Sequence, residues 1–327
     1  MTQSFEELKP MLRPVGVHMG VMEVDAEKCI SCGLCIKNCP FKCWKMGDND
    51  IPKMKETHSC FSCFNCIIAC PVDAVSIVEA YHVNEGFFDI QYPPIKMPMK
   101  PRDAEGNPDE WTAIERVILE RRSVRNFKEN PVPEPLIRRV LEAGRFAPSA
   151  GNQQPWKFTV VTDKALISQL EEACHTVLQG IHAMYNDDQA VMNLVGNLPT
   201  GAFDPRVQGG FRCVAQKELP IFFNAPVVIF LGCNEKMASP EEHAGICGQN
   251  MNLAAKSLGL GSCWSNFGAT VDLIPEIKSK LGYDDTWRIY STLCLGYPQF
   301  RQEGMVPRYF RPVTWFRSGT DGPQIEE

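Results

Sequence analysis

The chain carries one cysteine pattern twice, as CISCGLCIKNCP at residues 29–40 and as CFSCFNCIIACP at residues 60–71. Each copy has the spacing C-x2-C-x2-C-x3-C-P, which is the spacing that holds [4Fe–4S] clusters. Three thiolates of one tight loop reach three irons of one cluster, and the fourth cysteine of each copy ligates the other cluster. The pattern therefore predicts two [4Fe–4S] clusters. Their expected ligand sets are Cys29, Cys32, Cys35 and Cys70 for one cluster and Cys60, Cys63, Cys66 and Cys39 for the other.

Zinc and disulfide bonds are the alternatives for these cysteines. Zinc takes four ligands per site and suits paired C-x2-C motifs, but it leaves the third cysteine and the Cys-Pro of each copy unexplained. Disulfide frameworks suit small secreted chains, whereas this chain has 327 residues. The stretch resembles a bacterial two-cluster ferredoxin. Residues 21–24 and 75–78 alternate between apolar and polar side chains, and we expect them to pair as strands around it.

Composition and charge narrow the class of protein. The net charge is -6 and no basic stripe appears, which argues against a nucleic-acid partner. The longest clean apolar run, residues 227–231, is too short to cross a membrane. The acidic first residues contain no signal-peptide core, and the chain has 15 cysteines, so we expect a cytoplasmic protein in a reducing environment.

The sequence predicts three parts. Residues 1–85 form the ferredoxin module, residues 86–108 hold five prolines and form a linker, and residues 109–327 form a second module. Strands and helices alternate in the second module without a strict βαβ rhythm, so we expect an α+β fold with a mixed sheet flanked by helices. An irregular insertion is expected at about 182–220, where no clear period is found.

Periodicity and turn residues predict the elements of the second module. A helix that Asp109 caps is expected to contain Trp111 and Ile118, and a capping box is expected at residues 239–242. Residues 260–268 are expected to form a glycine-rich loop. The other expected helices cover 135–144, 165–181, 240–258 and 274–281, and the expected strands cover 158–161, 226–233 and 288–295.

Three arginines and a hydroxyl group lie within five residues, as Arg121, Arg122, Ser123 and Arg125. Arginine is a fork-shaped donor that suits phosphate oxygens, so the group predicts a phosphate site. The alternative is a solvated helix end, where cations also favour the helix dipole. No G-x-G-x-x-G or G-x-x-x-x-G-K-[ST] motif occurs, and the chain therefore offers no recognisable dinucleotide or nucleoside-triphosphate site.

Further segments extend the arginine motif into a family resemblance. Roughly residues 110–315 resemble the nitroreductase family of FMN proteins. The segments that carry this resemblance, in chain order, are residues 121–127, APSAGNQQPW at 147–156, LGLGSCW at 258–264, LGYP at 295–298, and Arg311-Pro312.

The resemblance implies a homodimer with FMN at the subunit interface. It assigns the FMN phosphate and ribityl chain to Arg121, Arg122, Ser123, Arg125 and Arg311. It assigns contacts from the partner subunit to Pro148, Ser149 and Asn152. It also puts the backbone amides of Ser265 and Asn266 beside flavin N5 and O4.

Several other residues can be interpreted as functional or as structural. Cys43 follows a complete ligand set and is expected to be structural, whereas Cys263 lies in the expected flavin loop. His175, His182 and Tyr185 are candidate proton donors, although surface or core roles are the simpler reading. Residues 208–212 are a candidate lid. No catalytic residue is assigned.

The combined motifs predict an FMN- and iron–sulfur-dependent oxidoreductase. Two clusters would accept electrons from reduced ferredoxin or another donor and pass them to FMN. The expected acceptor is a small organic molecule, namely a nitroaromatic, a quinone, an enone or a halogenated ring. One alternative is a flavin reductase fed by NAD(P)H, with the clusters as electron outlet or store. Another is an electron-transfer subunit without catalysis.

Overall fold

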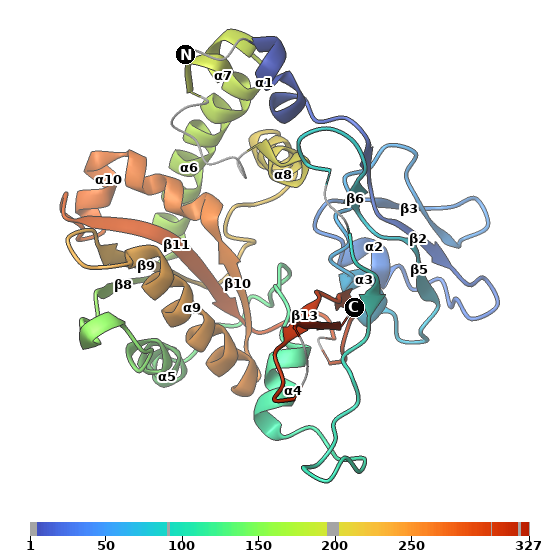
Figure 1. The fold of residues 1–327 in the computed structure, drawn as a ribbon. Coiled ribbons are helices and arrows are strands. Elements are labelled where there is room, and N and C mark those ends of the chain that lie inside the picture. The colour runs from blue at the N-terminus through green and yellow to red at the C-terminus, as the bar shows by residue number, and fades with distance from the viewer. Residues whose placement is uncertain (1–4, 90–91, 195–202, 302, 320–321, 327) are drawn as a thin grey trace.

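The computed structural model describes residues 5–89, 92–194, 203–301, 303–319 and 322–326. The cysteine-rich part lies on one side of the molecule and a helix-covered sheet lies on the other (Figure 1). None of the helices that these residues form is long and apolar enough to cross a membrane.

The cysteine-rich part contains short elements around two cysteine loops. Its strands pair as β1 with β6, β2 with β5, and β3 with β4. The expected pairing of residues 21–24 with 75–78 is confirmed, because Val24 faces Val75 in the antiparallel ladder. The elements are α1 (Phe5–Leu12), β1 (Val17–His18), β2 (Val21–Val24), α2 (Leu34–Lys37), β3 (Trp44–Met46), β4 (Pro52–Met54), α3 (Asn65–Ala69), β5 (Val75–Glu79) and β6 (His82–Val83).

The two cysteine loops have the same backbone shape. Gly33 precedes α2 with φ 66°, and Phe64 precedes α3 with φ 60°. This left-handed conformation is easy for glycine but uncommon for a bulky residue. It turns each loop sharply enough that its third cysteine, Cys35 or Cys66, lies in the first turn of the helix that follows.

The segment after the cysteine-rich part is largely irregular. Its short strand β7 (Ile95–Lys96) pairs with β12 (Arg308–Tyr309) from the other end of the chain. Helix α4 (Ala113–Glu120) follows, and Thr112 caps it in a reciprocal capping box with Glu115. The expected cap at Asp109 is therefore wrong, because a Thr side chain three residues before a Glu satisfies two backbone N–H groups at once.

The second module is built on one sheet, β10–β11–β9–β8, comprising β10 (Gly261–Ser265), β11 (Trp287–Gly296), β9 (Val227–Asn234) and β8 (Trp156–Val161). The α+β class is confirmed. The expected mixed sheet needs correction, because these four strands all pair antiparallel. Parallel pairing occurs at an isolated bridge between Ser123 and Ser262.

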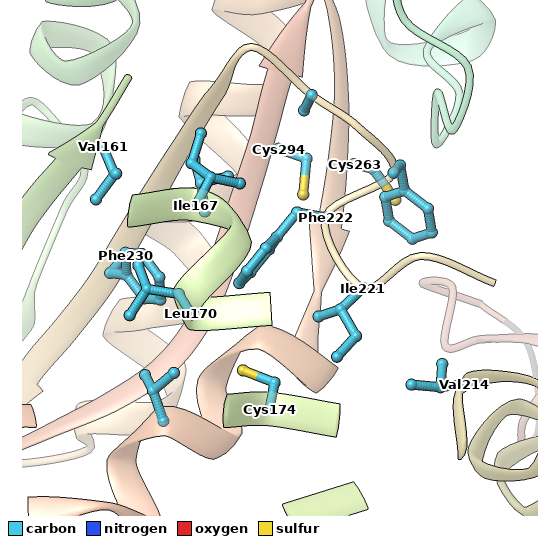
Figure 2. Packing of buried hydrophobic residues seen from close by; sticks show 14 of the residues in the cluster. Val161, Ile167, Leu170, Cys174, Val214, Ile221, Phe222, Phe230, Cys263 and Cys294 are labelled. Carbon is cyan, nitrogen blue, oxygen red and sulfur yellow. The ribbon is translucent and has the colours of Figure 1, made fainter. Parts of the chain in front are cut away.

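Helices cover both faces of the sheet. Every second residue of β9, beginning with Val227, packs toward α5 (Glu134–Arg145) and α9 (Pro240–Ser257). The alternate residues, such as Phe230, pack toward α6 (Lys164–Tyr185). Figure 2 shows Ile167 and Cys174 of α6 around Phe230 and Phe222. A strand buried on both faces reads as a continuous apolar run, which explains the uninterrupted sequence VVIFL.

Three sequence-based expectations for this module are wrong. Residues 260–268 form β10 and the start of the 3₁₀ segment η4 (Asn266–Leu273), because β11 pairs with the whole of β10. The expected capping box at residues 239–242 is absent, since Ser239 makes no side-chain cap bond. The expected irregular insertion is partly helical. Its described part contains the end of α6, α7 (Asp188–Leu194) and α8 (Pro205–Ala215).

Capping and burial explain the helices of the insertion. Asp204 accepts a hydrogen bond from the Arg206 N–H at 2.8 Å, and Pro205 opens α8. Phe203 is fully buried against Tyr185 and against Leu12 of α1. Residues 195–202, which were also expected to be irregular, lie outside the described residues. The remaining elements are η1 (Ala150–Asn152), α10 (Pro275–Lys280), β13 (Val313–Trp315) and β14 (Gln324–Glu326).

Candidate cofactor-binding site

Residues 121–127, here called the arginine loop, run in extended form beside strand β10. The Val124 N–H donates a hydrogen bond to the Ser262 carbonyl at 2.9 Å. Gly261 permits this approach, because a Cβ there would lie 2.8 Å from the Val124 methyl carbons. Phe127 forms an isolated bridge with Pro298. Three segments that are far apart in the sequence, 121–127, 258–264 and 295–298, therefore meet at one edge of the sheet.

A cavity of about 300 Å³, here called the arginine cavity, opens beside this loop. Three parts of the chain line most of it: residues 61–65, the arginine loop, and residues 307–309. Four cationic side chains are among its lining residues, namely Arg121, Arg122, Arg125 and Arg308. A phosphate dianion would suit this concentration of guanidinium groups.

Burial destabilises the charged forms of three of these arginines, namely Arg121, Arg122 and Arg308, and so lowers their pKa values. Burial, and then the charges of Arg308 and Arg121, lower the pKa of Arg122 to about 10. Burial also lowers the pKa of Arg308. The hydrogen bonds of Arg122 go to backbone carbonyls, including that of Gly304 at 2.8 Å, and its Nε has no partner among the described residues. An unpaired buried donor beside other cations fits an anionic ligand in this cavity.

Arg308 is a cavity residue that the sequence reasoning missed. Arg311, which the family resemblance favoured, is not among the residues that line this cavity, and its guanidinium carbon lies 5.7 Å from the centroid of the Tyr309 ring. The pairing of Arg308 with Lys96 sets the position of the whole segment. A motif with two arginines three residues apart does not reveal which one faces the cavity until that pairing is known.

The segment that contains Pro148, Ser149 and Asn152 lies elsewhere. Pro148 and Asn152 are exposed, and none of the three lines the arginine cavity. The segment is held in place by its own contacts, since the Ala150 N–H donates a hydrogen bond to His243 Nε2 at 2.9 Å. Within one chain, Pro148, Ser149 and Asn152 therefore lie apart from the arginines of the arginine cavity.

Ser265 and Asn266 mark the end of β10 and do not line the arginine cavity. Ser265 is buried, and its hydroxyl donates a hydrogen bond to the Ile221 carbonyl at 3.1 Å. Cys263 is buried two residues earlier, where its thiol interacts with the side chains of Ser123 and Arg125. Cys263 therefore lies directly behind the arginine loop.

The other candidates lie on helices of the insertion. His175, His182 and Tyr185 are on α6, and none of them lines the arginine cavity. The expected lid, residues 208–212, is part of α8. Arg212 Nη2 on this helix donates a hydrogen bond to Ser59 Oγ at 2.9 Å, so the lid candidate contacts the cysteine-rich part.

The cysteines of the two motifs form two groups. Cys29, Cys32, Cys35 and Cys70 line one small cavity, here called the outer site. The other four, here called the inner site, adjoin one another: the pKa of Cys66 is raised by burial and then by the charges of Cys63, Cys39 and Cys60. Each group combines three cysteines of one motif with the fourth of the other.

The spacing of the sulfurs favours a cluster over a single zinc ion. A zinc–sulfur bond of 2.3 Å puts tetrahedral ligands about 3.8 Å apart. Among the described residues, the one group of three metal-type donor atoms that lie within 4.8 Å of one another is His18, Glu79 and His82, and no three cysteine sulfurs do so. Among the described residues, these sulfurs therefore lack the close spacing that one zinc ion requires.

The geometry of the group formed by His18, Glu79 and His82 does not suit a metal site. The two imidazole rings stack with a centroid distance of 4.4 Å and an interplanar angle of 4°. A ring nitrogen presents its lone pair in the ring plane, so lone pairs of parallel stacked rings do not converge on one ion. His82 Nδ1 also lies 3.1 Å from the Ala80 carbonyl.

Comparisons with known proteins agree with this arrangement. The profile described as Nitroreductase family matches residues 118–297, more than half of the 327 residues. The chain belongs to the nitroreductase family. The profile described as 4Fe-4S dicluster domain matches residues 21–73. The predicted fusion of an iron–sulfur domain with a nitroreductase domain is therefore confirmed, and the protein is an oxidoreductase of this family.

Individual relatives match the nitroreductase domain. An NADH dehydrogenase of Thermus thermophilus is 30% identical over 187 residues, covering 55% of this chain and 84% of that protein. A nitrobenzene nitroreductase of Ectopseudomonas oleovorans is 26% identical over 200 residues, covering 56% of this chain and 86% of that protein. A solved nitroreductase with bound FMN from Bacteroides fragilis is 24% identical and covers 65% of this chain and 98% of its own, with a TM-score of 0.44.

Three amide side chains join the iron–sulfur domain to the nitroreductase domain. Asn126 Nδ2 donates to Asn38 Oδ1 at 3.3 Å, and Asn38 Nδ2 donates to the Asn65 carbonyl at 3.2 Å. Asn65 Nδ2 in turn donates to the Ser123 carbonyl at 3.5 Å. Asn38 precedes Cys39 and Asn65 precedes Cys66 in the sequence. These hydrogen bonds therefore connect two segments that carry cysteines of the inner site with the arginine loop.

Proposed function

We propose that this protein passes electrons from two [4Fe–4S] clusters to FMN and from FMN to a small organic acceptor. One observation carries the proposal: Cys63 of the inner site and the arginines of the nitroreductase domain line the same cavity. A cofactor whose phosphate bound these arginines would lie beside a cluster held by Cys63. The domains we propose are residues 1–85, the linker 86–108, and residues 109–327 with the insertion at about 182–220.

The residues we propose as cofactor ligands follow from this arrangement. The inner site and the outer site, with four cysteines each, would hold one cluster each. Arg121, Arg122, Ser123 and Arg125 would bind the FMN phosphate, together with Arg308 in preference to Arg311. Bound FMN would take up electrons from the clusters and supply them to the acceptor. The chain itself would orient FMN and exclude water beside it.

The remaining site residues require a second copy of the chain. Pro148, Ser149 and Asn152 lie apart from the arginines of their own chain, so we propose that they reach the FMN of a partner subunit in a homodimer. Ser265 and Asn266 would approach the flavin ring through their backbone amides. Large apolar side chains on the nitroreductase domain support a dimer, since Ile114 is 73% and Phe146 is 70% exposed.

The acceptor we propose is a nitroaromatic, a quinone, an enone or a halogenated ring. A relative named nitrobenzene nitroreductase supports the first of these. The donor we propose is reduced ferredoxin or another one-electron carrier. The cysteines of the described chain are all free, which suits the reducing cytoplasm that we propose as its location.

A second candidate is a flavin reductase that takes electrons from NAD(P)H. The relative named NADH dehydrogenase favours it, and the clusters would then serve as outlet or store. In a third candidate the protein is an electron-transfer subunit without turnover, which an insertion closed over the flavin would favour.

Anaerobic titration separates these candidates. Reduced ferredoxin should bleach the clusters and the flavin together. If both clusters become reduced while the flavin stays oxidised, the proposed relay is wrong. Rapid bleaching of the flavin by NADH alone would support the second candidate. Reduction of both cofactors without turnover of any acceptor would support the third.

A further inference from the structure

The two cysteine motifs differ in the residues directly before their third and fourth cysteines. Asn65 and Asn38 each directly precede a cysteine of the inner site. Their counterparts in the other motif, Leu34 and Ala69, each directly precede a cysteine of the outer site. Both residues beside the inner site are therefore amides, and both counterparts beside the outer site are apolar. Since each position is apolar in the other motif, the cysteine loops themselves do not need these amides.

The two amides are buried where the iron–sulfur domain meets the arginine loop. Asn38 is 5% and Asn65 is 7% exposed, and a buried amide needs hydrogen-bond partners. Asn38 Nδ2 donates to the Asn65 carbonyl, so the two segments of the inner site are linked to each other. The other bonds of the network reach Ser123 and Asn126, which flank Arg125 in the arginine loop.

The same contact borders the arginine cavity. Asn65 lines this cavity together with Cys63 of the inner site and with Ser123 and Arg125 of the arginine loop. Hydrogen bonds to the segments that carry ligand residues fix the orientation of a cofactor site. The amides therefore hold the inner site and the arginine loop in one relative position.

We propose that Asn38, Asn65 and Asn126 are positioning residues that set the distance between the inner cluster and FMN, and so control electron transfer between them. This inference rests on the proposed function, in which both sites hold clusters and the arginine cavity holds the FMN phosphate. Each transfer takes one electron from the reduced inner cluster to FMN. Two transfers, with two protons from solvent, complete the reduction. The outer site lacks these amides, so electrons leave through the inner cluster.

The internal repeat supplies the substitutions that test this role. Asn65→Leu and Asn38→Ala introduce the residues that the other motif has at these positions, so both cysteine loops should still form. Anaerobic stopped-flow spectrometry with reduced ferredoxin and FMN-saturated protein separates reduction of the clusters from reduction of the flavin. We expect clusters that are reduced at the wild-type rate. Flavin reduction should be slowed roughly tenfold, because a misplacement of about 1 Å can slow a reaction step about 10²-fold.

Asn250→Ala is the matched control. Asn250 Nδ2 also donates to a backbone carbonyl, that of Ala143 at 3.2 Å, but this bond joins two helices within the nitroreductase domain. Both rates should stay at the wild-type value in this variant.

A second measurement reports the distance without turnover. FMN is replaced by 5-deaza-FMN, whose ring does not accept single electrons, and the clusters are reduced with dithionite. The reduced clusters are paramagnetic and broaden the ³¹P resonance of the flavin phosphate, and this broadening falls steeply with distance. It should decrease in Asn65→Leu and Asn38→Ala and stay unchanged in Asn250→Ala.

The outcomes separate this inference from the proposed function. Wild-type flavin reduction in both variants, or slowed reduction with unchanged ³¹P broadening, would overturn this inference and leave the proposed function standing. A flavin that the clusters never reduce in the wild-type protein would overturn the proposed function, and this inference with it. If Asn65→Leu and Asn38→Ala lose iron, Asn126→Ala carries the test, because Asn126 lies outside the cysteine motifs. That variant must then slow flavin reduction and decrease the broadening.

Discussion

Arg212 on α8 donates a hydrogen bond from Nη2 to Ser59 Oγ at 2.9 Å, and Ser59 directly precedes Cys60. The insertion of the nitroreductase domain is therefore attached to the inner cysteine site. Gly209, one turn earlier on α8, also lies against Ser59, since a Cβ there would be 3.8 Å from Ser59 Cβ. This contact joins the lid candidate to the proposed path of electrons.

Replacing Arg212 with alanine should loosen this attachment. We expect faster hydrogen exchange in α8 and in residues 57–60, with a loss of unfolding free energy of only about 1 kcal/mol, because the bond is partly exposed. Hydrogen-exchange mass spectrometry measures the change. Arg138→Ala is the control, because that arginine pairs with Glu134 on the exposed face of α5. Equal exchange in Arg212→Ala and wild type would show that the contact does not hold the helix.

FMN affinity should distinguish Arg308 from Arg311. Arg308→Gln removes a cation from the arginine cavity, so we expect FMN binding to weaken roughly 10- to 100-fold, as for the loss of a charge-assisted hydrogen bond. Arg311→Gln should weaken it less, because Arg311 does not line this cavity. Quenching of FMN fluorescence by flavin-free protein measures both. A larger loss of FMN affinity in Arg311→Gln would contradict this assignment. It would indicate that Arg311 binds the phosphate, as the family resemblance implies.

Gly261→Ala should displace the arginine loop from β10 and so disturb the arginine cavity. The added Cβ would lie 2.8 Å from the Val124 methyl carbons, so the arginine loop must move away from β10. We expect a loss of about 1–3 kcal/mol in unfolding free energy and weaker FMN binding. Gly245→Ala on α9 is the matched control, because a Cβ there meets nothing within 4 Å. The control should be neutral or slightly stabilising. Similar behaviour of both variants would argue against the close approach.

Alkaline pH should destabilise the nitroreductase domain through Cys233. Burial, and then the charge of Glu235, raises the pKa of Cys233 from 9.0 to about 12. Between these values the unfolded state binds fewer protons than the folded state, so stability falls as pH rises. At pH 10.5 the loss is about 2 kcal/mol. The melting temperature of wild type should drop more than that of Cys233→Ala between pH 8.5 and pH 10.5. Parallel curves for the two proteins would contradict the assignment.

The sequence predicted those features whose signal is local. The paired cysteine spacing indicated the iron–sulfur domain, and the alternation at residues 21–24 and 75–78 indicated the strand pair β2–β5. The apolar run at 226–233 indicated β9, which is buried on both faces. Each of these depends on neighbours in the sequence, and periodicity or spacing is enough to recognise it.

Features that depend on distant partners were missed. The glycines in 260–268 suggested a loop, but Gly261 is required for the contact of β10 with Val124. The region 182–220 showed no clear period, yet its helices are stabilised by Phe203 and by α1 from the far end of the chain. The choice between Arg308 and Arg311 depends on the pairing of β12 with β7. None of these contacts can be predicted from the residues that are adjacent in the sequence.

The most direct test of electron transfer from clusters to flavin is an anaerobic stopped-flow experiment with the intact FMN-loaded protein. Reduced ferredoxin is mixed with it in less than stoichiometric amount, and cluster and flavin absorbance are followed together. The account predicts that the clusters are reduced first and that the flavin then bleaches at a first-order rate independent of protein concentration. Clusters that stay reduced beside an oxidised flavin, or a flavin that bleaches before them, would contradict it.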